Sequence, residues 1–185
     1  MQKFVNFLTL YRMVASPLIF ISLLYLDLKS LALFLFITAA LSDFLDGYLA
    51  RLFKVESRMG SILDPIADKI LLVSTLITIV LFLESLFIGF VSLLLISREF
   101  WVSAIRIAMS SSKTNLSSTL LAKLKTATQF TALSAYFISI QQGFAMGYLL
   151  ADFILFLSLM LSIKSAIGYT KGFYEQLDLD LKVKN

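Results

Sequence analysis

The sequence contains no cysteine and no histidine. Their absence excludes disulfide bonds, thiol nucleophiles, zinc fingers and imidazole bases. A metal ion in this protein must therefore bind to carboxylate oxygens, and a general base must be an aspartate, a glutamate, a lysine or a tyrosine.

Charged residues are also scarce. Only 15% of the 185 residues are charged and 59% are hydrophobic, whereas soluble domains average about 25% charged and about 45–50% apolar residues. A soluble globular protein of this size could not bury so much apolar surface, so the composition predicts an integral membrane protein. The small net charge of +4 is dispersed among apolar runs, which excludes nucleic acid as a partner.

Apolar runs recur along the whole chain, and each is long enough for a transmembrane helix of about 20 residues. The sequence predicts an all-α, polytopic membrane protein with six spans, near residues 4–26, 30–52, 60–83, 86–108, 118–140 and 146–169. There is no internal repeat or linker, so we expect one membrane domain over residues 1–169, followed by a C-terminal tail, residues 170–185, in the cytoplasm.

The basic residues fall almost entirely on one side of these predicted spans. We assign four segments to one side of the membrane: the N-terminus, the connection between the second and third spans, the connection between the fourth and fifth spans, and the C-terminus. That side then holds all of the 16 Lys and Arg residues except Lys29. Because cytoplasmic loops are enriched in Lys and Arg, both termini are expected in the cytoplasm. We therefore expect a multi-pass protein of the cytoplasmic (inner) membrane, in contact with membrane lipids.

Four aspartates interrupt the second and third apolar runs, where charges are costly. Asp43 and Asp46 are three residues apart, and Asp64 and Asp68 are four apart, so each pair lies on one face of its helix. Each intramembrane carboxylate costs about 2.5–3.5 kcal/mol on insertion scales. Lys69 and Arg51 could neutralise part of this charge, and the four acids could form structural ion pairs or a proton relay between helices. A cluster of oxygen ligands alone, however, favours one or two Mg²⁺ or Mn²⁺ ions.

The spacing of these acids is also specific. Residues 43–68 read Asp-x2-Asp-Gly-x2-Ala-Arg-x8-Gly-x3-Asp-x3-Asp, which resembles the full motif of the CDP-alcohol phosphatidyltransferases at every fixed position. The resemblance implies a six-helix membrane enzyme, usually a homodimer. Such enzymes use two divalent metal ions on the cytoplasmic side to displace CMP from a CDP-linked lipid with an alcohol.

The resemblance also implies roles for individual residues. The metal ligands would be Asp43, Asp46, Asp64 and Asp68, and Asp68 would also be the catalytic general base. The residues implied to bind CDP-diacylglycerol are Asn6, Thr9, Arg12, Gly47, Ala50, Arg51, Ser57 and Gly60. Asn6, Thr9 and Arg12 share a helical face. The alternative to nucleotide binding is a structural role, in which Asn6 caps the helix and the Arg12 side chain extends to the membrane interface.

The acceptor alcohol depends on a second set of residues. Basic side chains interrupt the fourth and fifth apolar runs at Arg98, Arg106, Lys123 and Lys125. Solvated charge at the membrane surface is one reading, and a phosphate pocket is the other, because an acceptor phosphomonoester requires several cations. The stretches Arg-Glu-x6-Arg and Lys-x-Lys-Thr-x2-Gln are similar to bacterial family members that use sn-glycerol 3-phosphate.

We therefore expect transfer of the phosphatidyl group from CDP-diacylglycerol to sn-glycerol 3-phosphate. Relatives that use inositol phosphate are the closest alternative, because that acceptor is also a phosphomonoester. From other classes, a cation-coupled transporter would require inverted repeats and broken helices, which the sequence does not show. A scaffold protein would give no reason for four costly acids.

Overall fold

The computed structural model describes residues 2–53, 58–109 and 120–184, and within them the side chains of residues 7–42, 63–109, 121, 124–175 and 177. This part of the chain is entirely helical, as predicted. Its six helices are α1 (Gln2–Leu24), α2 (Lys29–Phe53), α3 (Arg58–Leu83), α4 (Leu86–Met109), α5 (Leu120–Gln142) and α6 (Ala145–Lys184).

The helix bounds follow the apolar runs to within a few residues, except at the C-terminus. There α6 continues as one helix to Lys184, well beyond the apolar run that was expected to end near residue 169. The predicted tail therefore continues the last helix. Its place in the cytoplasm remains a prediction.

Within the described part of the chain, four segments are long and apolar enough to cross a membrane: Phe7–Leu24, Leu63–Leu83, Leu86–Met109 and Ala145–Glu175. Within α2, Lys29–Ser42 is a shorter apolar stretch. Large apolar side chains also cover the outer surface, among them Leu86, Phe90 and Phe153. Soluble proteins rarely expose contiguous apolar surface on this scale, so the structure supports a membrane protein, while the count of six spans remains a prediction.

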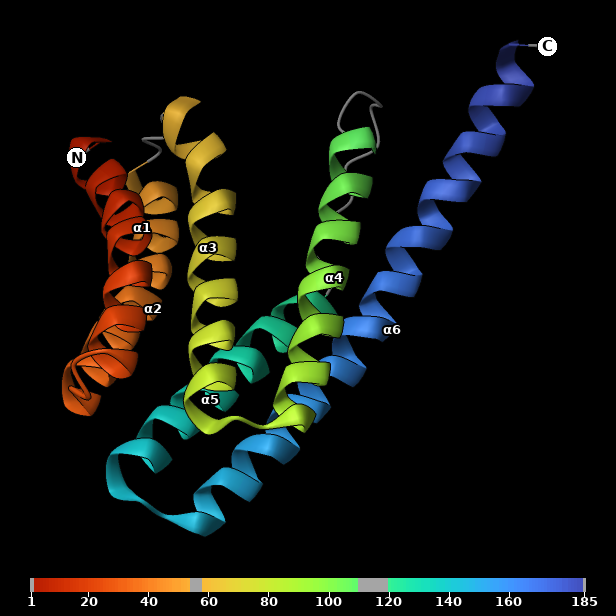
Figure 1. Ribbon diagram of the computed structural model, residues 1–185. Helices are drawn as coiled ribbons and strands as arrows, with labels where there is room; N and C mark the ends of the chain where they lie inside the picture. The colour runs from red at the N-terminus through yellow and green to blue at the C-terminus, as the bar shows by residue number, and fades with distance from the viewer. Residues whose placement is uncertain (1, 54–57, 110–119, 185) are drawn as a thin grey trace.

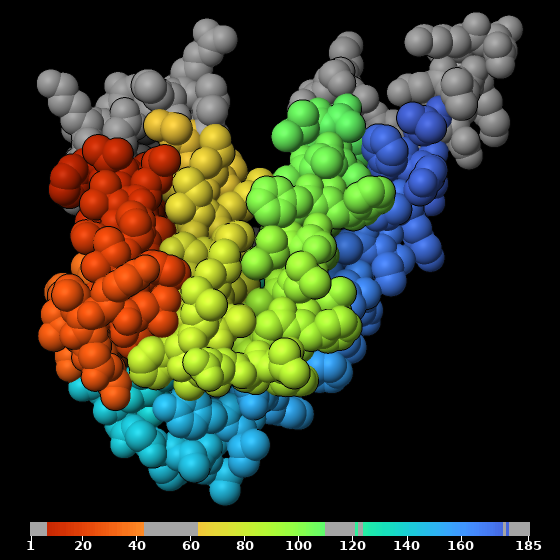
Figure 2. Space-filling model, in the orientation of Figure 1, coloured from red at the N-terminus to blue at the C-terminus, as the bar shows by residue number. Residues whose placement is uncertain are grey.

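The helices form two groups that spread apart toward one end (Figure 1). α1, α2 and α3 pack together on one side, α4 packs on α6 on the other, and α5 joins the groups by contacting both α6 and α2. In the space-filling view the surface is hollowed between α3 and α4 (Figure 2). The core includes an aromatic stack in which Phe36 of α2 lies 5.0 Å from Phe137 and 6.0 Å from Phe130 of α5, centroid to centroid.

Three tight turns connect α1 to α2, α3 to α4 and α5 to α6, and all lie at the opposite end of the molecule from the C-terminus (Figure 1). Each turn has one residue with positive φ: Asp27 (51°), Glu84 (50°) and Gly143 (66°). The left-handed conformation suits glycine and is uncommon for other residues. These turns set the antiparallel packing that brings the ends of α2 and α4 and the starts of α1 and α3 to the other end.

Candidate functional site

Two of the four motif acids have described side chains, and both lie on one face of α3. Asp64 and Asp68 are one helical turn apart and face α1, which packs against α3. Their side chains are 35% and 43% exposed. The acids are therefore accessible from outside the helix pair, as a ligand site requires.

Thr9 and Arg12 of α1 contact these acids directly. The Thr9 hydroxyl donates a hydrogen bond to Oδ1 of Asp64, and Nη1 of Arg12 donates to Oδ1 of Asp68. Nη2 of Arg12 lies 3.4 Å from Oδ1 of Asp64. The Arg12 side chain is fully buried, so the guanidinium is held between α1 and α3. The structure thus places two residues predicted to bind the nucleotide against two predicted metal ligands.

The cation beside these acids is not the lysine that the sequence pointed to. Lys69 makes no hydrogen bond or ion pair with the described residues and instead lines a cavity of about 530 Å³, whose other walls include Phe20, Ile70 and Phe100. Arg12 is able to reach both acids because α1 packs along α3, a tertiary contact that spacing within α3 cannot reveal. The side chain of Arg51, the other expected cation, lies outside the described residues.

Several predicted site residues cannot be placed in the same detail. The side chains outside the described set are those of Asn6, Asp43, Asp46, Gly47, Ala50, Arg51, Gly60 and Lys123, and Ser57 lies outside the described backbone. The backbone from Asp43 to Arg51 is helical within the last turns of α2, and Gly60 lies in the first turn of α3. Both segments lie at the end of the molecule where α1 begins (Figure 1).

The described acids are chemically suited to a divalent ion. Both contacts to Asp64 use Oδ1, so its Oδ2 accepts no hydrogen bond from the described residues. Carboxylate oxygens are the ligands that Mg²⁺ and Mn²⁺ prefer. Among described side chains no three acids gather closely enough to hold a metal, so a metal at this position would also require ligands from elsewhere, such as the acids of α2.

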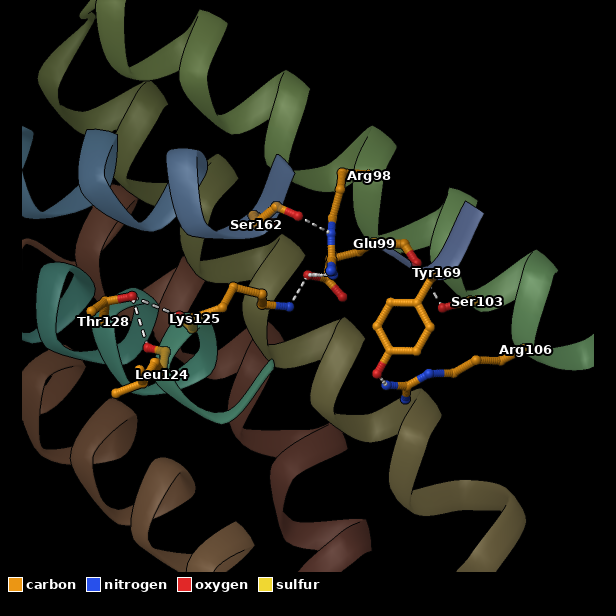
Figure 3. Close-up of polar contacts among 9 residues, drawn as sticks. All are labelled: Arg98, Glu99, Ser103, Arg106, Leu124, Lys125, Thr128, Ser162 and Tyr169. Carbon is orange, nitrogen blue, oxygen red and sulfur yellow. Dashed lines mark hydrogen bonds and ion pairs between the residues drawn. The ribbon is translucent and has the colours of Figure 1, made fainter. Parts of the chain in front are cut away.

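A second polar cluster joins α4, α5 and α6 (Figure 3). Oε1 of Glu99 accepts hydrogen bonds from Nη1 of Arg98, at 3.1 Å, and from Nζ of Lys125. Nε of Arg98 donates to the carbonyl oxygen of Ser162 at 2.9 Å. The side chains of the three charged residues are 9–14% exposed. Arg98 and Lys125 therefore share one carboxylate, which leaves this cluster with a net charge of about +1 at neutral pH.

Arg106 lies beside this cluster and contacts Tyr169 of α6 (Figure 3). Its Nη2 donates to the tyrosine hydroxyl at 2.9 Å, and the guanidinium lies 5.0 Å from the ring centroid. A guanidinium over an aromatic ring is favourable by about 0.5–1 kcal/mol when exposed. Three of the four predicted phosphate-binding residues are thus found on neighbouring faces of α4 and α5.

Sequence reasoning missed the partners of these cations. Glu99 interrupts the fourth apolar run beside Arg98, which is a signal for a buried ion pair, but the sequence analysis gave it no pairing role. The sequence analysis also assigned no role to Asp152, an acid in the sixth apolar run. Asp152 accepts a hydrogen bond from the hydroxyl of Tyr136. That contact joins α5 to α6, and its signal was again a single acid in an apolar run.

Comparison with known proteins identifies the family of this chain. The family model described as CDP-alcohol phosphatidyltransferase matches residues 3–164. Three similar proteins are named CDP-diacylglycerol–glycerol-3-phosphate 3-phosphatidyltransferase. The protein from Cereibacter sphaeroides is 41% identical over 138 residues, which cover 72% of this chain and 62% of that relative.

The other two are similar over most of their length. The Rickettsia typhi protein is 34% identical over 93% of this chain and 97% of the relative. The Haemophilus influenzae protein is 32% identical over 88% of this chain and 89% of the relative. The family match over residues 3–164 includes nearly all of α1, the acid pair of α3 and the cluster on α4 and α5.

Proposed function

Because the chain belongs to the CDP-alcohol phosphatidyltransferase family, we propose that it transfers the phosphatidyl group of CDP-diacylglycerol to sn-glycerol 3-phosphate. The products are phosphatidylglycerophosphate and CMP, so the protein acts in phospholipid biosynthesis. The observation that carries the choice of acceptor is the shared name of the three relatives, one of which aligns over 97% of its length.

The acid site supports the donor half of the reaction. Asp43, Asp46, Asp64 and Asp68 would hold two Mg²⁺ or Mn²⁺ ions, and metal ions bound there would neutralise the diphosphate and stabilise the departing CMP. Arg12 and Thr9 orient the two α3 acids through the hydrogen bonds described above. The CDP moiety would lie against this face of α1 and the adjoining ends of α2 and α3. The residues proposed to bind it, besides Thr9 and Arg12, are Asn6, Gly47, Ala50, Arg51, Ser57 and Gly60.

The cluster on α4 and α5 supports the acceptor half. A phosphomonoester carries up to two negative charges, and arginine binds it with two parallel hydrogen bonds. Arg98 and Lys125 are already held in place by Glu99, and Arg106 is held by Tyr169. These residues, with Lys123, would bind the phosphate of glycerol 3-phosphate.

The reaction is then a direct displacement. The primary hydroxyl oxygen of glycerol 3-phosphate forms a bond to the β-phosphorus of CDP-diacylglycerol, the bond from that phosphorus to the oxygen of CMP breaks, and the hydroxyl proton passes to Asp68. A covalent enzyme intermediate is disfavoured because the chain has no cysteine or histidine nucleophile.

The proposed setting is the cytoplasmic (inner) membrane. Six spans, cytoplasmic termini and an active site facing the cytoplasm are supported by the distribution of basic residues and by the shared end of α1, α2 and α3 (Figure 1). A homodimer is proposed from the family alone.

An acceptor panel tests this function. Purified protein in detergent, with CDP-diacylglycerol and Mn²⁺, should release CMP with glycerol 3-phosphate and little with inositol phosphate, inositol or serine. Chelation of divalent ions and Asp64→Asn should each abolish release. Preference for inositol phosphate would reassign the acceptor while keeping the reaction, and activity that survives exhaustive chelation would overturn the metal mechanism. A transporter or scaffold would release no CMP at all.

A further inference from the structure

A groove between α4 and α6 borders the proposed acceptor site at Arg98, and its other lining residues are assigned to neither substrate. It encloses about 530 Å³, within the roughly 300–1,000 Å³ usual for small-molecule sites. α6 lines it with residues spaced three or four apart along one helical face, and α4 lines it with Ser97, Arg98 and Trp101. The α6 residues are Ile163, Ala166, Ile167, Thr170, Lys171 and Tyr174.

The lining changes in character along the groove. Ile163, Ala166 and Ile167 form an apolar floor, and both isoleucines are exposed, at 39% and 52%. Further along α6 come Lys171 and Tyr174, close to the end of the apolar segment at Glu175. Lysine and tyrosine at that depth are typical of the membrane interface, where headgroups lie.

Trp101 forms the opposite wall and makes a hydrogen bond across the groove. Its indole N–H donates a hydrogen bond to Oγ1 of Thr170 at 3.1 Å, yet the side chain remains 55% exposed. More than half of the indole is therefore accessible to a ligand in the groove. An apolar floor, an aromatic wall and a cation at headgroup depth together match one class of molecule.

We propose that this groove binds one anionic phospholipid. Its acyl chain would lie along Ile167 and Ile163, and its phosphate would meet the Lys171 ammonium between Trp101 and Tyr174. A basic residue near an anionic membrane surface contributes about 1 kcal/mol, which corresponds to about a fivefold preference for an anionic over a zwitterionic headgroup. Charge complementarity thus selects the lipid class.

The chain provides its own reporter, because Trp101 is its only tryptophan. Brominated acyl chains quench tryptophan fluorescence on close approach. The protein is reconstituted in phosphatidylcholine bilayers with a chelator and no acceptor, so that no turnover occurs. Dibrominated phosphatidylglycerol or dibrominated phosphatidylcholine is then added in increasing mole fraction. Phosphatidylglycerol should reach half-maximal quenching at about fivefold lower mole fraction.

Two lysines of α6 form a matched pair for the test. Lys171→Gln should remove the preference for phosphatidylglycerol, whereas Lys164→Gln, at an exposed residue outside the groove, should leave it unchanged. Ala166→Leu, which fills the floor, should weaken quenching by both lipids. Equal quenching of the unmodified protein by the two lipids, or equal effects of the two lysine variants, would overturn the proposal. Absence of quenching by either lipid would also overturn it and would indicate that a second copy of the chain covers the groove.

Discussion

A buried arginine between two partly exposed acids is the main electrostatic feature of the α1–α3 pair. Removing a charge from water is costly unless a partner of opposite sign compensates for it. Arg12 is fully buried, and its compensation comes from Asp64 and Asp68 of another helix. The same three side chains therefore stabilise the helix pair and shape the proposed donor site.

Arg12→Ala should destabilise the protein because it removes the cation between two acids. Breaking a buried pair costs about 3–5 kcal/mol, and the lower end applies here because the acids are more than a third exposed. Thermal unfolding in detergent measures the loss. Lys29→Gln is the matched control, since its exposed pair with Asp27 at 3.8 Å is worth less than about 1 kcal/mol. Equal melting temperatures of the two variants would contradict the role given to Arg12.

Asp68→Asn tests the proposed base. The amide retains an oxygen that accepts the hydrogen bond from Arg12, but it cannot take the proton of the attacking hydroxyl. Turnover should fall by about 10²–10⁴-fold, while CDP-diacylglycerol and Mn²⁺ still bind. Single-turnover kinetics and the paramagnetic resonance of Mn²⁺ separate the two effects. Near-normal turnover with intact metal binding would leave Asp68 as a metal ligand only.

Lys125→Ala should raise the KM for glycerol 3-phosphate by about 10–100-fold, because a hydrogen bond to a charged group contributes about 1.5–3 kcal/mol. The KM for CDP-diacylglycerol should stay unchanged, since Lys125 contacts Glu99 of α4 and none of the described donor-site residues. Steady-state kinetics with each substrate varied in turn gives both values. Lys164→Ala, outside this cluster, is the control. Parallel changes in both KM values would assign Lys125 a structural role instead.

At the residue scale, sequence reasoning found side chains more reliably than their partners. A charged residue in a membrane span is energetically costly, and a charge within an apolar run is easily recognised in a sequence. This signal identified Asp64, Asp68, Arg98 and Lys125. The pairing of Lys125 with Glu99 depends on how α5 crosses α4. No local spacing encodes that crossing, so the partner of each charge required the structure.

At the scale of elements, α5 and α6 form a helical hairpin in which the two helices pack closely at Gly147. A Cβ atom added at Gly147 of α6 would lie 2.3 Å from Oγ and 3.2 Å from Cβ of Ser139 on α5. Small residues at helix contacts allow such close packing in membrane proteins. The Tyr136–Asp152 hydrogen bond joins the same two helices nearby, so a glycine contact and a polar contact both support this hairpin.

Gly147→Ala should destabilise the protein by about 1–3 kcal/mol, because the added methyl group overpacks the contact with Ser139. Ser139→Gly in the same chain should restore part of the loss, and a double-mutant cycle on thermal unfolding measures the coupling. Gly168→Ala is the control: nothing lies within 4 Å of its added Cβ, so it should stabilise α6 by about 0.4–1 kcal/mol. Loss of stability in both variants would refute the packing argument.

Helix existence was predictable because each apolar run is long and bounded by polar residues. The exception is instructive. From Tyr169 onward the hydrophobic signal fades, yet α6 continues, since leucine, lysine and glutamate are good helix formers whether or not lipid surrounds them. Hydrophobicity therefore locates the expected membrane segment, whereas helix propensity sets where the helix ends.

At the scale of the whole molecule, the three tight turns lie at one end, and the donor-site segments lie at the other (Figure 1). In the predicted topology every Lys and Arg residue except Lys29 falls on the side of the donor-site segments. The positive-inside rule therefore predicts that the turns lie outside and that the proposed site faces the cytoplasm.

The absence of cysteine makes this orientation directly measurable, because each introduced cysteine is the only thiol in the chain. Tyr25→Cys and Leu86→Cys replace side chains that are 76% and 91% exposed near two of the turns, and Leu177→Cys replaces one that is 45% exposed near the end of α6. In intact cells a membrane-impermeant maleimide should label the first two variants. It should label the third only after the membrane is permeabilised, because an odd number of spans separates a turn from the C-terminal end. Labelling of Leu177→Cys in intact cells would reverse the orientation and place the aspartate site outside, where neither CDP-diacylglycerol nor glycerol 3-phosphate would be supplied from the cytoplasm.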